Sequence, residues 1–367
     1  MKKNIIFLLI SVFTFSLSAQ SKSYNLLIGT YTNTGKSEGI YAYHIDMKTN
    51  EISQISVTKD VSNPSYLALT PDHKFIYSVN ESPEVSAANA FAFDDKNGKL
   101  TLINRSLTKS SGACDISVTD KHVFTANYGG GSLTVYGRNE NGSLTDVLQV
   151  IQHIGKSINI ERQGEPHVHQ VIVSRDKKYV LANDLGTDKV TVYQYNPTSK
   201  TEILIPFDTL TVKLGSGPRH AVFSKDGTKL YLVQEIDGTV SLLGFEKGKL
   251  SLIQETTVER KPGIVNRTAD IHLSPDEKYL YVTNRGTAND ITCFSVGQDG
   301  KLEFKQQIST KGDGPRNFAI TPDGQYIFVA HQFTDNVTIF SRDSKTGFLT
   351  NTDNQIKVGA PVCLVFY

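Results

Sequence analysis

The segment Gly217-Pro-Arg-His-Ala-Val-Phe-Ser-Lys-Asp-Gly-Thr-Lys-Leu-Tyr-Leu-Val-Gln-Glu235 contains the pattern that decides the fold. A short strand-like run leads into a Lys-Asp-Gly turn, and a second run of aromatic and β-branched residues follows. The same pattern recurs at residues 63–81 and 314–332, with Pro-Asp in the turn of both copies. Each copy therefore predicts two antiparallel strands joined by a tight turn.

Aligning the remaining sequence on this unit gives seven copies. Their first inner-strand residues are separated by 46 to 55 positions and are Pro64, Ala113, Val168, Pro218, Thr268, Pro315 and Pro361. Six copies continue into two further strands joined by hairpin turns, and four strands per repeat of this length are typical of β-propeller blades. The seventh copy has only Val362–Phe366, and its three missing strands match Tyr24–Tyr31, Gly39–Asp46 and Ile52–Thr58. We therefore predict an all-β, seven-bladed β-propeller with four antiparallel strands per blade, closed when the C-terminal strand completes the N-terminal blade.

Residues 1–19 have the features of a signal peptide. Lys2 and Lys3 precede an apolar run that ends in Leu17-Ser18-Ala19, and residues 20–367 are then expected to form a single propeller domain. Cleavage after Ala19 would change the formal net charge from +1 to −1. Such a chain offers no basic field for nucleic acid or an anionic membrane surface, so we expect an exported protein, periplasmic or secreted, with neither partner. The sequence makes no prediction of its oligomeric state.

Cysteine usage does not indicate a disulfide framework. The three cysteines, Cys114, Cys293 and Cys363, each lie inside a strand-like apolar run. An odd number cannot pair completely, so we expect buried thiols despite the oxidising compartment.

Repeat equivalence predicts which side chains meet at the central channel. The residue after the first inner-strand residue is Ser65, Cys114, His169, Arg219, Ala269, Arg316 or Val362. The residue that ends the second strand is Tyr31, Glu81, Tyr128, Asp184, Glu235, Arg285 or Gln332. The residue before it is an amide in five repeats, Asn80, Asn127, Asn183, Gln234 and Asn284, and His331 in a sixth. Amides at strand ends also close turns on their own backbone, which is an alternative explanation of this column of amides. That explanation does not apply to Arg219, Arg285 and Arg316. Folding of the repeat does not need them, because gathering charged side chains around a confined channel carries a desolvation cost.

Several motifs together resemble the propeller-type lactonase family. They are Leu27-Ile-Gly-Thr-Tyr31, Pro166-His-Val-His-Gln170, Gly217-Pro-Arg-His220, Gln234-Glu235 and Asn284-Arg-Gly286. That family includes bacterial 6-phosphogluconolactonases and enzymes that cyclise carboxymuconate. The resemblance implies a small-molecule lactone or sugar-acid substrate and no cofactor. It also implies a site of one histidine, two arginines and one glutamate, which match His167 or His169, then Arg219, Glu235 and Arg285.

Opening a cyclic ester needs an activated water and a place for the negative charge that develops on the carbonyl oxygen. We expect Glu235 or His169 to act as the general base, with Arg219 and Arg285 holding the oxyanion and any acidic group of the substrate. Additional substrate-binding residues are predicted to be His167, Arg316, His331, Glu81 and Asp184.

Other chemistries have weaker sequence support. His167 and His169 share a strand face but have no third metal ligand of matching spacing, so no metal site is predicted. Cys114 has no local activating signature for a nucleophile. Two alternatives stay open: a propeller that binds a ligand or protein without catalysis, and a carboxymuconate-type lactonising enzyme that uses the same residues.

Overall fold

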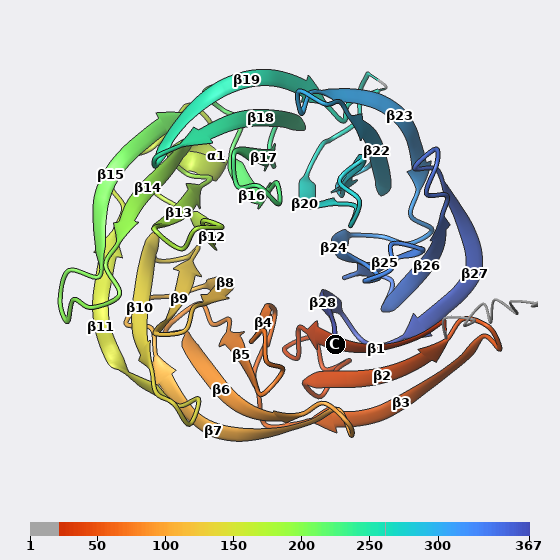
Figure 1. Ribbon diagram of the computed structural model, residues 1–367, viewed down its shortest axis with the longest axis horizontal. Helices are drawn as coiled ribbons and strands as arrows, with labels where there is room; N and C mark the ends of the chain where they lie inside the picture. Colours follow the sequence, from red (N-terminus) through yellow and green to blue (C-terminus); the bar gives the residue numbers. More distant parts are fainter. Residues whose placement is uncertain (1–21, 261) are drawn as a thin grey trace, which may run out of the picture.

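The predicted repeats form seven four-stranded antiparallel sheets arranged as blades around a central axis (Figure 1). The computed structural model describes residues 22–260 and 262–367, so the predicted signal peptide lies outside the described residues. The predicted seven-bladed propeller is thereby confirmed. One element was not predicted, the short helix α1 (Ile160–Gln163).

The blades are numbered here by their order along the chain, and their strands are given from the innermost strand outward. Blade 1 contains β28 (Pro361–Phe366), β1 (Ser23–Thr30), β2 (Ile40–Asp46) and β3 (Glu51–Thr58); blade 2 contains β4 (Leu67–Leu69), β5 (Phe75–Asn80), β6 (Ala87–Asp94) and β7 (Lys99–Leu107); blade 3 contains β8 (Ala113–Val118), β9 (His122–Asn127), β10 (Ser132–Arg138) and β11 (Leu144–Gln152). Blade 4 contains β12 (Val168–Val173), β13 (Tyr179–Asp184), β14 (Lys189–Tyr195) and β15 (Leu204–Thr211); blade 5 contains β16 (Pro218–Phe223), β17 (Lys229–Gln234), β18 (Thr239–Glu246) and β19 (Lys249–Thr257). Blade 6 contains β20 (Thr268–Leu273), β21 (Tyr279–Asn284), β22 (Asp290–Val296) and β23 (Leu302–Ser309); blade 7 contains β24 (Pro315–Ile320), β25 (Tyr326–His331), β26 (Asn336–Arg342) and β27 (Leu349–Lys357).

The two ends of the described chain close the ring within blade 1. The C-terminal strand β28 pairs antiparallel with β1, with Leu26 opposite Phe366 and Ile28 opposite Leu364. In Figure 1 the blue β28 accordingly lies beside the red β1. Pairing first and last strands leaves no free inner edge between blades 1 and 7, which avoids an exposed edge strand.

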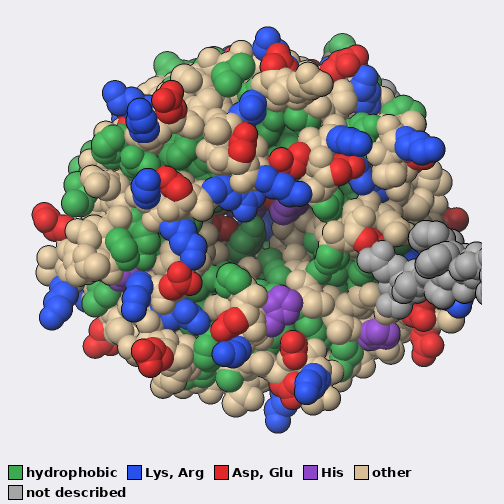
Figure 2. Space-filling model, viewed as in Figure 1, with side chains coloured by type: hydrophobic (Ala, Val, Ile, Leu, Met, Phe, Trp, Pro, Cys, Tyr) green, Lys and Arg blue, Asp and Glu red, His purple; other side chains and the backbone are tan. Residues whose placement is uncertain are grey.

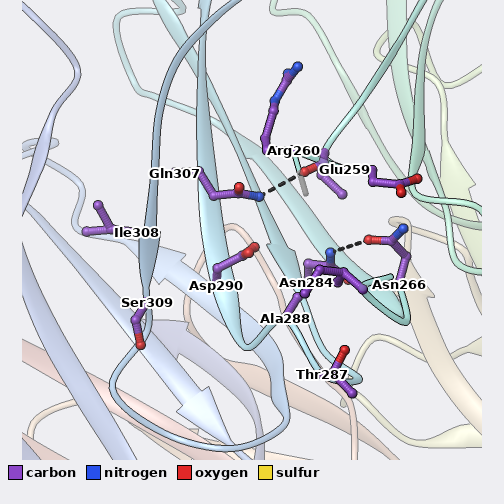
Figure 3. A pocket seen from close by; sticks show the side chains of 12 residues that line it. Glu259, Arg260, Asn266, Asn284, Thr287, Ala288, Asp290, Gln307, Ile308 and Ser309 are labelled. Atoms are coloured by element: carbon purple, nitrogen blue, oxygen red, sulfur yellow. Dashed lines mark hydrogen bonds between the residues drawn. The ribbon is translucent and has the colours of Figure 1, made fainter. Parts of the chain in front are cut away.

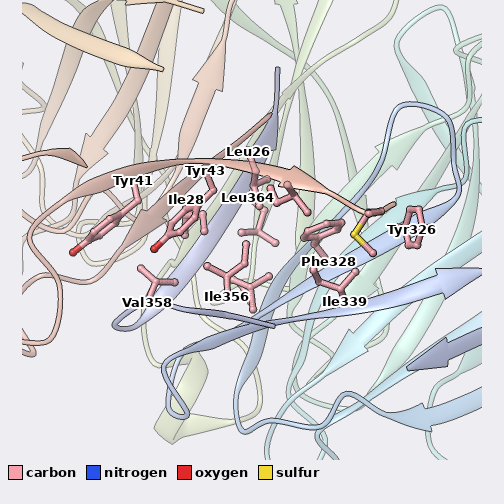
Figure 4. Close-up of a cluster of buried hydrophobic side chains, with 14 residues drawn as sticks. Leu26, Ile28, Tyr41, Tyr43, Tyr326, Phe328, Ile339, Ile356, Val358 and Leu364 are labelled. Atoms are coloured by element: carbon pink, nitrogen blue, oxygen red, sulfur yellow. The ribbon is translucent and has the colours of Figure 1, made fainter. Parts of the chain in front are cut away.

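The core is divided into seven hydrophobic clusters, one between each pair of neighbouring blades. Alternation along each strand explains this division, because successive side chains point to opposite faces. In β1, for example, Leu26 and Ile28 pack against Phe328 of blade 7, while Leu27 packs against blade 2. Figure 4 shows the cluster between blades 7 and 1. Each blade therefore buries its two apolar faces against its two neighbours.

The inner strands share an irregularity near their first residues. Pairing with the second strand shifts register between Val168 and Gln170 in blade 4 and between Pro315 and Asn317 in blade 7, and related shifts occur in blades 3, 5 and 6. A β-bulge leaves the extra residue outside the ladder and changes its direction. The extra residues include His169 and Arg316, and the bulge thus explains why this column is free for function.

The residue directly after the bulge position of each inner strand links neighbouring blades through polar contacts. Side-chain oxygens of four such residues accept backbone N–H groups of the following blade: Asp115 from Val171 (2.9 Å), Gln170 from Ala221 (2.7 Å), Asp270 from Phe318 (3.3 Å) and Asn317 from Leu364 (2.7 Å). Buried polar groups are expected to be satisfied in this way. We call these residues after the bulge the second column; their role is structural, and the sequence analysis considered only the bulge column before it.

The ring is hollowed at its centre, and lysine and arginine side chains stand beside the opening in the space-filling view (Figure 2). All three cysteines are free and buried, as predicted. Among the described residues, no helix has the length and hydrophobicity required to cross a membrane.

Candidate functional site

Four residues predicted to form the site come together from three blades. His169 lies in β12 and Arg219 in β16, whereas Glu235 directly follows β17 and Arg285 directly follows β21. We call these residues, together with Arg162, the Glu235 cluster. Residues at the bulges of inner strands and residues that follow second strands thus lie together at one rim of the channel, as the repeat alignment predicted.

Three arginines converge on the single carboxylate of Glu235. Arg219 Nε and Arg285 Nη2 each donate to Oε2 at 2.9 Å, and Arg162 Nη2 donates to Oε1 at 2.6 Å. The side chains of Arg219, Arg285 and Arg162 are 1%, 12% and 29% exposed. Arg219 is therefore the floor of the cluster, where it also donates to the carbonyl of Ala269. Arg162 is its outermost cation.

The charges of the cluster control the ionisation of Glu235. Burial by itself would raise the pKa of this carboxyl, but the charges of Arg285, Arg219 and Arg162 hold the pKa well below its usual range. Glu235 is consequently an ionised carboxylate at neutral pH. Three arginines around one carboxylate leave an excess of positive charge, which favours a ligand with anionic or strongly polarised oxygen atoms.

His169 is buried beside this carboxylate, with Nε2 4.0 Å from Glu235 Oε2. Burial and the neighbouring charge of Arg219 lower its pKa well below the ordinary value, so the imidazole is neutral at neutral pH. Its ring contacts the rings of Tyr128 and His220 edge-on at 5.4 Å and 5.3 Å. A neutral histidine held in this way has a lone pair that can accept a proton.

The other histidine of the motif, His167, lies differently. Its ring stacks on Tyr128 at 4.3 Å between centroids, and its Nδ1 lies 2.9 Å from the carbonyl oxygen of Tyr128. The geometry therefore brings His169, rather than His167, against Glu235.

A second carboxylate occupies the equivalent repeat position in blade 2. Glu81 Oε2 accepts hydrogen bonds from Tyr31 Oη at 3.0 Å and from Ser65 Oγ at 2.5 Å. The guanidinium of Arg316 lies over the Tyr31 ring, 5.5 Å from its centroid. We call these four residues the Glu81 cluster. Glu81 and Glu235 are the carboxylates that act on the charge of Arg316, and among the described residues neither forms a hydrogen bond with it.

Cys114 lies between the two clusters. Its Sγ is 3.8 Å from His169 Nδ1 and 3.3 Å from the carbonyl oxygen of the same residue. Burial, followed by the charge of Glu81, raises the pKa of this thiol well above its ordinary value. A protonated thiol is a weak nucleophile.

Two residues predicted to bind substrate are engaged elsewhere. Asp184 pairs with His153 Nδ1 at 2.8 Å and accepts the backbone N–H groups of His167 and Gly186. His331 is completely buried against Gly312 and the backbone of Thr310 and Asn336. His331 precedes the strand-end column by one residue, so it points to the opposite face, into the blade. The structure does not bring these two residues to either cluster.

Sequence reasoning missed Arg162 and the contacts of His220. Arg162 comes from α1, in the connection between β11 and β12, and the 55-residue interval between Ala113 and Val168 was the available signal of an insertion there. His220 Nδ1 lies 2.9 Å from Asp270 Oδ1, and Asp270 Oδ2 lies 3.0 Å from His272 Nε2. These residues belong to or neighbour the structural second column, which holds His220 against His169.

Two other features do not add to the site. Among the described residues, no three His, Cys, Asp or Glu side chains are arranged to hold a metal ion. A cavity of about 310 Å³ lies on blade 6, bordered by Asn266, Asn284 and Gln307 (Figure 3). Its amide groups already bind protein atoms: Asn284 Nδ2 donates to Asn266 Oδ1, and Gln307 Nε2 donates to the carbonyl of Val258, both at 2.8 Å. It contains no residue of the two clusters.

Comparison with known proteins gives consistent matches over nearly the whole chain. The family model described as "Lactonase, 7-bladed beta-propeller" matches residues 25–366. The chain is 32% identical to a protein named 6-phosphogluconolactonase from Formosa agariphila, over 93% of this chain and 99% of that one. It is also 32% identical to the Bacillus subtilis protein of the same name, over 92% and 97% of the two chains. The solved structure of a periplasmic gluconolactonase from Pseudomonas aeruginosa superposes with a TM-score of 0.89 at 35% identity, covering 94% of this chain and 99% of that chain.

Proposed function

Because the chain belongs to the lactonase family of seven-bladed β-propellers, we propose that it hydrolyses a lactone at the Glu235 cluster. The observation that carries this proposal is the convergence of Arg162, Arg219 and Arg285 on one carboxylate beside a neutral, buried histidine. The arrangement combines a proton acceptor with cations for developing negative charge, which are the two requirements for opening a cyclic ester.

His169 acts as the general base in this proposal. A base must be unprotonated before reaction, and the lowered pKa of His169 meets that condition. Glu235, whose two oxygens already accept three arginine hydrogen bonds, is the poorer acceptor for a further proton. Its part is to hold the arginines and to stabilise the imidazolium that forms when His169 takes a proton from water.

Arg285 stabilises the oxyanion, and Arg219 supports Glu235 from below. Arg285 Nε donates to the carbonyl of Arg267 at 3.2 Å and Nη2 donates to Glu235, which leaves donors of Nη1 for a ligand oxygen. Arg219 is almost fully enclosed by protein, and its contacts are with Glu235 and Ala269. Donors aimed at the position where charge develops lower the barrier most.

Arg316 binds an acidic group of the substrate, such as a carboxylate or a phosphate. Its support is its position over Tyr31 and the absence of a hydrogen bond to either neighbouring carboxylate, Glu81 or Glu235. Arginine suits both anions because its donors form a planar fork. The named relatives act on a phosphorylated lactone and on gluconolactone, so a pair of lactones with and without a phosphate is the appropriate probe.

A pH-stat assay on gluconolactone and 6-phosphogluconolactone tests the proposal. We expect the wild type to release acid, and His169→Gln to lower kcat/KM by about 10²- to 10⁴-fold, the usual contribution of a general base. His122→Gln is the matched control, because His122 is also a buried histidine but bonds Tyr195. Wild-type-like turnover by His169→Gln would refute the assigned base, and no turnover by the wild type would favour a purely binding propeller.

Export of the protein is part of the same proposal. Its support is the predicted signal peptide, together with a structural relative named as periplasmic. N-terminal sequencing of protein recovered from the cell envelope or medium tests it, and the expected first residue is Gln20. An intact Met1 on the recovered protein would contradict export by this route.

A further inference from the structure

The connection between β11 and β12 reaches over the Glu235 cluster. It spans residues 153–167, contains α1, and carries Arg162, whose Nη2 lies 2.6 Å from Glu235 Oε1. That oxygen is the one that Arg219 and Arg285 leave free, since both of them bind Oε2. Arg162 is also the most exposed of the three arginines, so it is the first cation of the cluster that an arriving ligand meets.

Two buried carboxylates hold this connection: Asp184 binds its ends, at His153 and at the N–H of His167, and Asp188 binds the part that contains α1. Ser157 Oγ donates to Asp188 Oδ2, and Gln163 Nε2 donates to Asp188 Oδ1 at 2.8 Å. Asp188 and Gln163 are both completely buried. The two contacts bracket α1, because one lies before the helix and the other is the last helical residue, directly after Arg162.

The carboxylate of Asp188 also binds the strand that carries Arg219. Asp188 accepts the backbone N–H groups of Gly215 at 2.6 Å and Gly217 at 2.8 Å. The carbonyl oxygen of Gly217 in turn accepts the N–H of Glu235 at 2.7 Å. Asp188 therefore connects the backbone segments that deliver Arg162, Arg219 and Glu235.

The equivalent turns of other blades show which contacts of Asp188 are common to the repeats and which are not. Asn289 Oδ1 accepts the N–H of Gly314, and Asp335 Oδ1 accepts the N–H of Ala360, both at 3.0 Å. The link to the next blade is thus a repeated feature that asparagine also provides. The added contacts with Ser157 and Gln163 distinguish Asp188, and they coincide with the blade connection that carries Arg162.

We propose that Asp188 is a positioning residue that holds Arg162 over Glu235 Oε1, and that Arg162 contacts an anionic or carbonyl oxygen of the bound lactone. This inference rests on the proposed function of the Glu235 cluster. Asp188 acts only through Arg162 and does not touch the ligand. The 153–167 connection thereby becomes part of the site rather than a surface loop.

A double-mutant cycle on kcat/KM tests the coupling. We expect Arg162→Ala to lower kcat/KM by about 10- to 100-fold, mainly through KM, as for the loss of a hydrogen bond to a charged group. Asp188→Asn, which retains the acceptor that Asn289 uses, should lower kcat/KM similarly, and the double variant should be no worse than Arg162→Ala alone. Asp335→Asn is the matched control and should behave as wild type. Additive effects, or a wild-type kcat/KM for Asp188→Asn, would overturn the proposal.

Limited trypsin digestion tests the attachment of the connection without any activity. Trypsin cleaves after lysine and arginine, and the connection contains Lys156 and Arg162. Lys156 directly precedes Ser157, and Arg162 lies within α1. Asp188→Asn should be cut there several-fold faster than wild type, and Asp335→Asn at the wild-type rate. Equal cleavage rates would overturn the proposal whatever the activity. If the wild type opens no lactone while Asp188→Asn is cut faster, the proposed function and the ligand contact of Arg162 fail, and only the attachment stands.

Discussion

Glu81 and Glu235 occupy the same position in their repeats, directly after the second strand of a blade, yet their surroundings differ. Glu235 accepts hydrogen bonds from three arginines, whereas Glu81 accepts them from the hydroxyl groups of Tyr31 and Ser65. Arg316, near Glu81, has an aromatic ring rather than a carboxylate as its contact. The repeat thus fixes where a carboxylate stands, and the neighbouring blades decide what it does. We expect Glu235 to organise charge, and the Glu81 side to receive the acidic end of a ligand.

The largest expected difference between the two carboxylates is in stability. Glu235→Gln removes the carboxylate that these three arginines share, and breaking a buried ion pair costs about 3–5 kcal/mol. Glu81→Gln keeps an oxygen acceptor for both hydroxyl groups, so its loss should be about 1 kcal/mol. Urea unfolding of both variants measures the free energies. Equal losses would show that the arginines do not depend on Glu235 and would remove the contrast.

The second difference concerns the ligand. Arg316→Gln should lower kcat/KM for 6-phosphogluconolactone by about 10- to 100-fold, the loss expected for a hydrogen bond to a charged group. Gluconolactone has no phosphate, so it serves as the internal control and should change by less than about threefold. A similar decrease for both lactones would assign Arg316 to general integrity of the channel instead of anion binding.

Acid should reduce the stability that Glu235 contributes. The folded-state pKa of Glu235 lies well below the unfolded value of 4.5, because the arginine charges outweigh the effect of burial. Its contribution is therefore fully present above the unfolded pKa and is lost as pH falls through the folded pKa. The difference in unfolding free energy between wild type and Glu235→Gln should shrink as pH is lowered from about 5 to about 3. A constant difference over that range would contradict the ion-pair description.

The smallest effect is expected for Cys114, which lies between the two clusters. Its thiol has a raised pKa because it is buried, so it should not serve as a nucleophile. Cys114→Ala should keep kcat/KM within about threefold of wild type, and iodoacetamide should inactivate wild type and variant equally slowly. A variant without activity would restore the covalent alternative.

The fold was largely predictable, because each repeat carries a complete local signal. The turn and the two strands of residues 217–235 recur in six blades, and in the seventh the two strands come from opposite ends of the chain. An error of one residue at a strand end changes neither the number of blades nor their order around the ring. The blade that is shared between the two ends was also predictable, since three strands were missing at one terminus and present at the other. The helix α1 escaped because four residues are too few for a periodic pattern.

The candidate site was only partly predictable. Repeat alignment brought His169, Arg219, Glu235 and Arg285 to one rim, and the structure brings these side chains together. It also suggested Asp184 and His331, whose side chains are engaged within their blades. The ladder pairs Asp184 with Val168 as it pairs Gln234 with Pro218 and His331 with Pro315, so both residues stand one position before the strand-end column, and the alignment of blade 4 was off by one residue. It omitted Arg162, which lies in an insertion without an equivalent in the other repeats.

The sequence by itself determined the number of blades, the closure of the ring and the column from which functional side chains come, because these follow from local patterns repeated seven times. Only the tertiary structure decided which charges meet. The partners of Glu235 lie 16, 50 and 73 positions away along the chain, and contacts over such distances depend on how neighbouring blades pack. The ionisation of His169 and Glu235 was likewise decided there, since burial and surrounding charge, rather than residue type, set their pKa values.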